Sequence, residues 1–169
     1  MHNAGVLIRP ARRDDDDAIW AILEPVLRAG ETWALPRDMS RDQALAFWHD
    51  GKDVLVAELD GRVVVSYFIR ANQMGGGSHV ANGGYMTASE AQGRGVARAM
   101  AADSLARARA RGFRAMQFNF VVSTNARAVR TWQAAGFDIA ARLPGAFQHP
   151  TLGFVDVYVM YQTLSAPHL

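Results

Sequence analysis

Two valine-rich segments joined by an Asp-Gly pair constrain the fold of this chain more than any other feature. The segments span residues 53–58 and 62–70, and Asp60 and Gly61 lie between them. An Asp-Gly pair between β-branched runs is typical of a tight hairpin turn. The sequence therefore predicts two adjacent antiparallel strands here.

Apolar patterns predict further elements on both sides of this hairpin. Before it, we expect a strand at residues 6–9, an amphipathic helix ending at Gly30, and a short helix at 40–49. After it, we expect a strand at 79–87, a helix at 95–111, a strand at 115–122, a helix at 125–135, and strands at 139–142 and 154–161. Antiparallel strands come first and a strand–helix–strand unit follows, so the predicted class is α/β (an α+β mixed sheet) with helices on its faces.

Composition narrows the classes of function. With 169 residues, half of them hydrophobic, residues 1–169 are expected to form a single domain. No apolar run reaches the ~18 residues of a membrane span or provides a signal-peptide core, so we expect a cytoplasmic protein without a membrane partner. The absence of cysteine excludes a disulfide scaffold, a cysteine nucleophile and a thiolate metal site. A net charge of +2 does not favour a nucleic-acid partner.

A glycine-rich turn separates the predicted strand at 79–87 from the helix at 95–111. It consists of Gln92, Gly93, Arg94, Gly95, Val96, Ala97 and Arg98. The glycines permit a positive φ and close approach, and the N–H groups that open a helix suit a pyrophosphate. A Rossmann turn needs a small residue where Arg98 stands, and a Walker loop needs a Gly-Lys pair, whereas the only lysine is Lys52. The alternatives left are a pyrophosphate site and a plain turn.

This turn and a second segment resemble the GCN5-related N-acetyltransferase (GNAT) family. The pattern Gln92-x-x-Gly95-x-Ala97 is similar to the family's acetyl-CoA loop, and residues 125–137 are similar to its N-x-R-A-x-x-x-Y-x-x-x-G-F helix. The resemblance implies about seven mostly antiparallel strands, splayed between the fourth and fifth, with about four helices. It also implies acetyl-CoA as co-substrate and no metal.

The resemblance assigns the cofactor-side roles. The end of the fourth strand, at Tyr85, Met86 and Thr87, would hold the pantetheine arm, and a β-bulge there would supply a backbone donor near Met86 or Thr87. The turn from Gln92 to Arg98 would hold the pyrophosphate. Asn125 would bond the CoA arm, the alternative being a plain helix cap. Trp132 stands where the family has a tyrosine that protonates the thiolate. An indole cannot do so, but it can pack against the CoA arm, and Tyr85 is the candidate substitute acid.

The acceptor side is less defined. His79 is the only titratable base on the predicted fourth strand. Asn82 and Asn119 lie on the fourth and fifth strands, where they would either bond neighbouring backbone or hold a polar substrate. The segments around both resemble fungal acetyltransferases that act on azetidine-2-carboxylate and related proline analogues, which implies that Asn82 and Asn119 are substrate ligands. The loop at Glu31, Thr32 and Trp33 is where the family places its acceptor wall.

The sequence thus predicts an N-acetyltransferase acting by direct attack on a small-molecule amine. One alternative is a CoA-responsive binding module without catalysis, and another is a peptide or protein N-acetyltransferase. A nucleic-acid binder that uses the cluster at Arg107, Arg109, Arg111 and Arg114 is a third, although these residues do not share one helix face. A solvated helix end explains that cluster better. Some of these arginines could instead contact the 3′-phosphate of CoA. The resemblance is also compatible with a homodimer.

Overall fold

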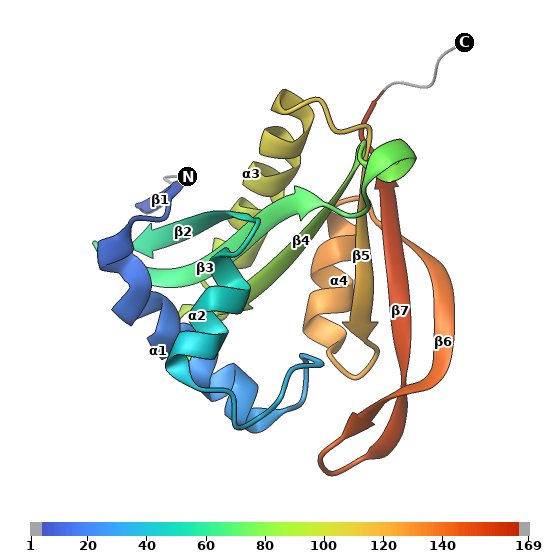
Figure 1. Ribbon diagram of the computed structural model, residues 1–169, viewed down its shortest axis with the longest axis horizontal. Helices are drawn as coiled ribbons and strands as arrows, with labels where there is room; N and C mark the ends of the chain where they lie inside the picture. The colour runs from blue at the N-terminus through green and yellow to red at the C-terminus, as the bar shows by residue number, and fades with distance from the viewer. Residues whose placement is uncertain (1–4, 166–169) are drawn as a thin grey trace.

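The computed structural model describes residues 5–165 as a mixed sheet with helices on both faces (Figure 1). The strands are β1 (Val6–Pro10), β2 (Asp53–Leu59), β3 (Arg62–Ala71), β4 (Val80–Thr87), β5 (Ala115–Val122), β6 (Asp138–His149) and β7 (Gly153–Thr163). The helices are α1 (Asp16–Ala29), α2 (Arg41–His49), α3 (Val96–Ala110) and α4 (Ala126–Ala134). Short 3-10 turns lie at Arg13–Asp15, Gly75–Gly77 and Ser89–Ala91.

The sheet separates between its fourth and fifth strands. The strand order is β1-β2-β3-β4-β5-β7-β6, and every neighbouring pair is antiparallel except β4 and β5. β4 and β5 run parallel and pair only at Val80–Ala115 and Ala81–Met116. Figure 1 shows them diverging toward their C-terminal ends. The predicted sheet, splayed at this position, is confirmed.

Side-chain alternation gives the sheet two apolar faces. On the front face, α1 and α2 pack through Ile19, Leu23 and Trp48 against Phe68 of β3. On the back face, α3 and α4 cover a cluster that contains residues from β3, β5 and β7. The α1 residues recur at spacings of three and four because that spacing aligns them on one side of a helix. The gap between β4 and β5 therefore has α1 and α2 on its front side and α3 and α4 on its back side.

The last two strands are longer than the sequence predicted. β6 continues beyond Arg142, because the chain absorbs Pro144 and Gly145 in a register shift between Leu143 and Phe147. Gly145 has a φ of +59°, and its N–H donates to Asp156 Oδ1 at 3.0 Å. Pro-Gly here makes an irregularity within a strand rather than a turn that ends it.

The acidic run before α1 is used locally. Asp15 is buried and accepts hydrogen bonds from the Arg9 guanidinium at 2.8 and 2.9 Å. These bonds hold the pKa of the Asp15 carboxyl below its ordinary value.

No helix within residues 5–165 combines the length and apolar character that a membrane crossing requires.

Candidate active site

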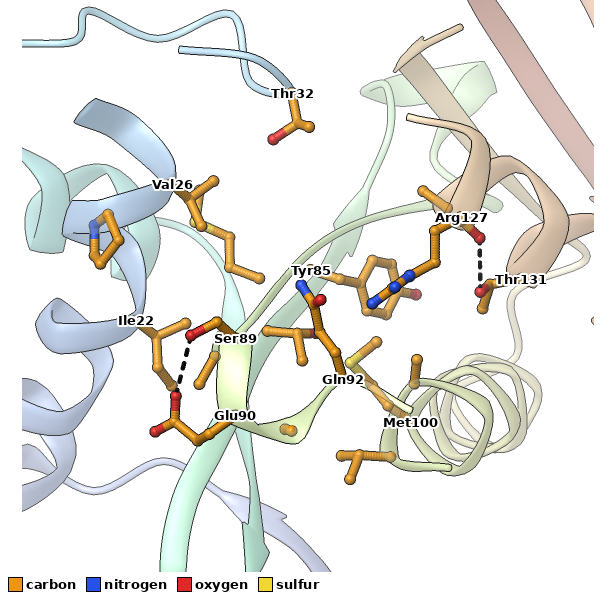
Figure 2. A pocket seen from close by; sticks show the side chains of 18 of the residues that line it. Ile22, Val26, Thr32, Tyr85, Ser89, Glu90, Gln92, Met100, Arg127 and Thr131 are labelled. Atoms are coloured by element: carbon orange, nitrogen blue, oxygen red, sulfur yellow. Dashed lines mark hydrogen bonds between the residues drawn. The ribbon is translucent and has the colours of Figure 1, made fainter. Parts of the chain in front are cut away.

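A cleft of about 1180 Å³ lies where β4 and β5 diverge. Figure 2 looks into it: Ile22 and Val26 of α1 form one wall, Arg127 and Thr131 of α4 the other, and Tyr85 and Gln92 lie between them. The lining includes the predicted cofactor and acceptor-wall residues Glu31, Thr32, Trp33, Tyr85, Met86, Thr87, Gln92, Gly93, Gly95, Val96, Ala97, Arg98, Asn125 and Trp132. Segments distant in the sequence thus meet around one space.

Backbone groups of β4 face this gap at alternate residues. The N–H of Ala88 donates to Val64 O, and the N–H of Asn72 donates to Val80 O, so even-numbered residues of β4 bond β3. Odd-numbered residues therefore turn their N–H and C=O groups toward β5, where pairing stops after Ala81. Tyr85 and Thr87 are the odd-numbered residues of β4 that also line the cleft. Their amides are free donors for a carbonyl in the gap.

The expected bulge in the fourth strand is not present. The register between β3 and β4 runs unbroken from Val65↔Thr87 to Ala71↔Ala81. The Met86 amide is consequently directed at β3, so it cannot be the donor that the resemblance implied. The irregularity lies in β5 instead, between Phe118 and Val121. The amides of Tyr85 and Thr87 are exposed because β4 and β5 stop pairing after Ala81, and not because β4 has a bulge.

The glycine turn forms the floor of the cleft and opens α3. Gly93 and Gly95 both have a φ of +76°, and Gly95 is the N-cap of α3. A Cβ at either residue would meet nothing within 4 Å, so the turn is open to a ligand. N–H groups at a helix start, with the positive end of its dipole, favour an anion. Arg94 points elsewhere and pairs with Asp60 at 3.0 Å on the surface.

Three arginines supply positive charge to the cleft. Arg98 was predicted, whereas Arg62 and Arg127 were not assigned a role from the sequence. Arg127 lies within the α4 motif, which is a signal that could have identified it. Arg62 follows the hairpin turn, and only the fold brings it to the cleft. The cluster near the end of α3 lies elsewhere: Arg107 pairs with Asp103 and Arg111 with Asp53, and neither lines the cleft.

Helix α4 combines an N-terminal cap with an aromatic anchor near its other end. Asn125 Oδ1 accepts the N–H of Ala128 at 3.3 Å, so the helix-cap role holds, and its Nδ2 has no hydrogen-bond partner in the described residues. Trp132 is only 7% exposed. Its ring lies 4.5 Å from that of Tyr85 and 4.6 Å from that of Phe118. The tryptophan at this position therefore packs as part of the wall.

Tyr85 is held as a neutral phenol. Its hydroxyl donates to Ser104 Oγ at 2.9 Å, and its ring stacks on Tyr67 at 5.3 Å. Burial raises the pKa of the Tyr85 phenol well above its ordinary value. A phenol that already donates to Ser104, on the back of β4, is not placed to protonate a thiolate in the gap.

Amide side chains gather on the front face where the gap begins. Asn82 is 6% exposed, and its Nδ2 donates to Gln117 O at 3.0 Å. Gln117 Nε2 donates to Asn119 Oδ1 at 2.9 Å, and Asn119 Nδ2 donates to Asn72 Oδ1 at 2.6 Å. We call Asn72, Asn82, Gln117 and Asn119 the amide cluster. It satisfies the polar groups of Asn82 and Asn119 within the protein, and neither residue lines the cleft itself.

Trp33 packs over β4 next to the amide cluster. A Cβ at Gly84, the residue between Asn82 and Met86 on the front of β4, would lie 2.6 Å from the Trp33 ring and 2.5 Å from the Phe68 ring. Trp33 also packs on Trp48, with ring centroids 5.6 Å apart. Gly84 thus allows the acceptor-wall loop to close directly on β4.

The structure does not bring His79 to the cleft. β4 begins at Val80, and His79 is an exposed turn residue at the paired end of β4 and β5. Tyr85 lies six residues farther along an extended strand, about 20 Å away. Distance therefore removes His79 as the catalytic base. The carboxylates that line the cleft are Glu31 and Glu90, within residues 5–165.

Comparisons with known proteins agree with this geometry. A sequence model of the acetyltransferase (GNAT) family matches residues 18–137. The structure of a GCN5-related N-acetyltransferase from Kribbella flavida is 39% identical, with a TM-score of 0.90 over 94% of this chain and 98% of that chain. The N-acetyltransferase aca1 of Schizosaccharomyces pombe is 26% identical over 153 residues, which cover 79% of this chain and 72% of that protein. The putative acetyltransferase yncA of Salmonella typhimurium, solved with acetyl-CoA, shares the fold at a TM-score of 0.84 and 23% identity, over 98% and 97% of the two chains.

Proposed function

The chain is a member of the GNAT acetyltransferase family, and we propose that it moves an acetyl group from acetyl-CoA to the amine of a small molecule by direct attack in a ternary complex. One observation carries the proposal: a single gap between β4 and β5 has a glycine turn and free backbone donors behind it and an amide cluster in front. The first half suits a nucleotide thioester, and the second suits a polar acceptor.

The cofactor half fits acetyl-CoA. The turn at Gly93 and Gly95 offers helix N–H groups to the pyrophosphate, and Arg62 and Arg127 add cations along the cleft. Asn125 Nδ2 is available to the pantetheine arm. The cleft volume of about 1180 Å³ exceeds the ~300–1,000 Å³ of ordinary ligand pockets, which suits a ligand as large as acetyl-CoA.

The reaction needs few side chains. A neutral amine attacks the thioester carbon, a C–N bond forms, and the C–S bond breaks. A gap-facing amide of Tyr85 or Thr87 donates to the carbonyl oxygen as negative charge develops there. The proton from the amine passes to water in the open cleft or to Glu31, which lies on the acceptor wall. The thiolate leaves without Trp132 as an acid, because a thiol pKa near ~8.5 makes it a tolerable leaving group.

For the acceptor, we propose an amino acid or a proline analogue. The likeness of the segments around Asn82 and Asn119 to acetyltransferases for azetidine-2-carboxylate supports this class. The hydrogen-bonded amide cluster supports it too, because it presents a polar surface on the front of the gap. A peptide acceptor is less favoured, because Trp33 closes against β4 at Gly84.

Release of free CoA from acetyl-CoA across a panel of amines tests the proposal. A thiol reagent reads CoA without background because the chain has no cysteine. The panel contains amino acids, cyclic imino acids, polyamines, aminoglycosides and short peptides. We expect strong turnover with an amino or imino acid. Tight acetyl-CoA binding with no turnover of any amine would instead favour a CoA-responsive module.

A further inference from the structure

One cation lies beside the amide cluster without an acidic partner. Arg70 is on the front of β3, directly opposite Asn82 in the register. Its Nε donates to Asn82 Oδ1 at 3.1 Å. In the part of the chain that the structure describes, no carboxylate lies within salt-bridge distance of Arg70, and its two terminal nitrogens make no hydrogen bond.

A second cation increases the positive charge on this face. The ammonium of Lys52 lies 5.2 Å from the Phe68 ring centroid, and Phe68 precedes Arg70 on the same face of β3. Lys52 donates to the carbonyl oxygens of Phe47 and Asp50, at 2.5 and 3.2 Å. The pKa of Lys52 is lowered by burial and by the nearby charge of Arg70. Two neighbouring cations thus share this face, and neither is within salt-bridge distance of a carboxylate of residues 5–165.

The guanidinium is already oriented for a planar anion. Asn82 accepts from Nε and is itself anchored to β5 through Gln117 O, so Arg70 is held beside the start of the gap. Two terminal nitrogens in a rigid fork match the two oxygens of a carboxylate. Arg9, by contrast, uses its terminal nitrogens to donate to the carboxylates of Asp15 and Glu58. Arg70 has no such partner among residues 5–165, so its terminal donors are available to a ligand.

Distance along β4 agrees with a small acceptor. Three residues of extended strand, about 10 Å, separate Asn82 from Tyr85. The carboxylate and amine of one amino acid, followed by the acetyl group of the thioester, span a distance of that order. Trp33 and Phe68, which pack over Gly84, would then form the apolar side of the acceptor site.

We propose that Arg70 binds the carboxylate of the acceptor and thereby makes this enzyme selective for amines that carry one. The inference rests on the proposed acetyl transfer to an amino or imino acid, and it names the group that selects that class. Asn82 positions Arg70, and the amide cluster holds Asn82 in place.

Matched acceptors test this proposal. L-Proline and L-azetidine-2-carboxylate are compared with their carboxamides, in the wild type and in Arg70→Gln, Arg70→Lys and Arg41→Gln. Arg41 is the control, because it pairs with Asp17 on the surface of α2 and lines no part of the cleft. The readouts are kcat/KM, the calorimetric affinity of each acceptor for the CoA-saturated protein, and the affinity for acetyl-CoA.

We expect the wild type and Arg41→Gln to prefer the acids over the carboxamides by about 10- to 100-fold in kcat/KM and in affinity. Arg70→Gln should abolish this preference without changing acetyl-CoA affinity, and Arg70→Lys should restore part of it. Equal losses for acids and carboxamides in Arg70→Gln would overturn the proposal. The proposal would also be overturned if the wild type showed no preference for the acids over the carboxamides, and this result does not depend on any variant.

Failure of this inference is distinguishable from failure of the proposed function. Turnover of amines without a carboxylate, alongside no binding of either imino acid, would overturn the role of Arg70 and leave acetyl transfer standing. Absence of CoA release with every amine would overturn both.

Discussion

The back and the front of the β4–β5 gap are built by different means. Behind the gap, backbone atoms would bind acetyl-CoA in the proposed function: the glycine turn, the start of α3, and the unpaired amides of Tyr85 and Thr87. In front, side chains would bind the proposed acceptor, through Arg70, the amide cluster and the indole of Trp33. A backbone site accepts one fixed ligand with little dependence on neighbouring side chains. A side-chain site changes its ligand when single residues change, which suits a family with one co-substrate and many acceptors.

The largest effect is expected from Gly95→Val, which breaks the back of the gap. A β-branched residue at a φ of +76° strains the turn, and its side chain enters the space left for the pyrophosphate. Acetyl-CoA affinity should fall by about 30-fold or more in a calorimetric titration. Gly112→Val is the control, because Gly112 has a φ of +84° near the other end of α3 and does not line the cleft. An unchanged affinity in Gly95→Val would refute the pyrophosphate turn.

Asn119→Ala should break the front while sparing the back. The change removes both the acceptor of the Gln117 bond and the donor to Asn72. We expect kcat/KM for the acceptor to fall about tenfold, roughly the cost of one or two such bonds, with acetyl-CoA affinity nearly unchanged. Equal losses in the two quantities, measured in the same preparation, would remove Asn119 from the acceptor side.

Gly84→Ala sharpens the comparison by testing how tightly the acceptor wall closes. The added methyl would lie within 2.6 Å of the Phe68 and Trp33 rings, so one of them must move. Overpacking of this kind costs about 1–3 kcal/mol of unfolding free energy, and the displaced Trp33 should also raise KM for the acceptor. Gly76→Ala is the matched control, because a Cβ there meets nothing within 4 Å. Similar denaturation midpoints for the two variants would contradict the packing described.

Tyr85→Phe should have the smallest effect on turnover. The phenol donates to Ser104 and remains neutral, so its loss should change kcat by less than about threefold and leave the pH–rate profile unaltered between pH ~7 and ~9. A loss of about 100-fold would make Tyr85 the acid that Trp132 cannot be.

The same phenol gives a pH dependence of stability. Burial raises the pKa of Tyr85 and of Tyr67 above the unfolded value near ~10. Their contribution to stability is therefore complete below about pH 10 and is lost as the pH rises above it. Denaturant midpoints measured from pH ~8 to ~11 should decline in the wild type, with a shallower decline in Tyr85→Phe. A parallel decline in both proteins would show that Tyr85 is not the source.

The back of the gap was largely predictable from sequence, and the front was not. Gly93 and Gly95 both adopt a positive φ, which favours glycine, so this turn leaves a local signature in the sequence. The amide cluster joins β4, β5 and Asn72, which follows β3, through side chains from residue 72 to residue 119, so no local pattern reports it. Asn82 and Asn119 stood out as polar residues in apolar strands. The pairing of Arg70 with Asn82 depends on the β3–β4 register, and the distance of His79 from the cleft depends on where β4 begins.

The most direct test of the account is to follow an isotopically labelled acetyl group from acetyl-CoA. The protein is incubated with labelled acetyl-CoA and the best acceptor of the amine panel, and the acceptor, the free acetate and the intact protein are analysed by mass spectrometry. The account predicts that the label appears on the acceptor nitrogen in an amount equal to the CoA released, with the protein unlabelled throughout. Label on the protein, or label recovered only as acetate, would contradict direct transfer across the gap between β4 and β5.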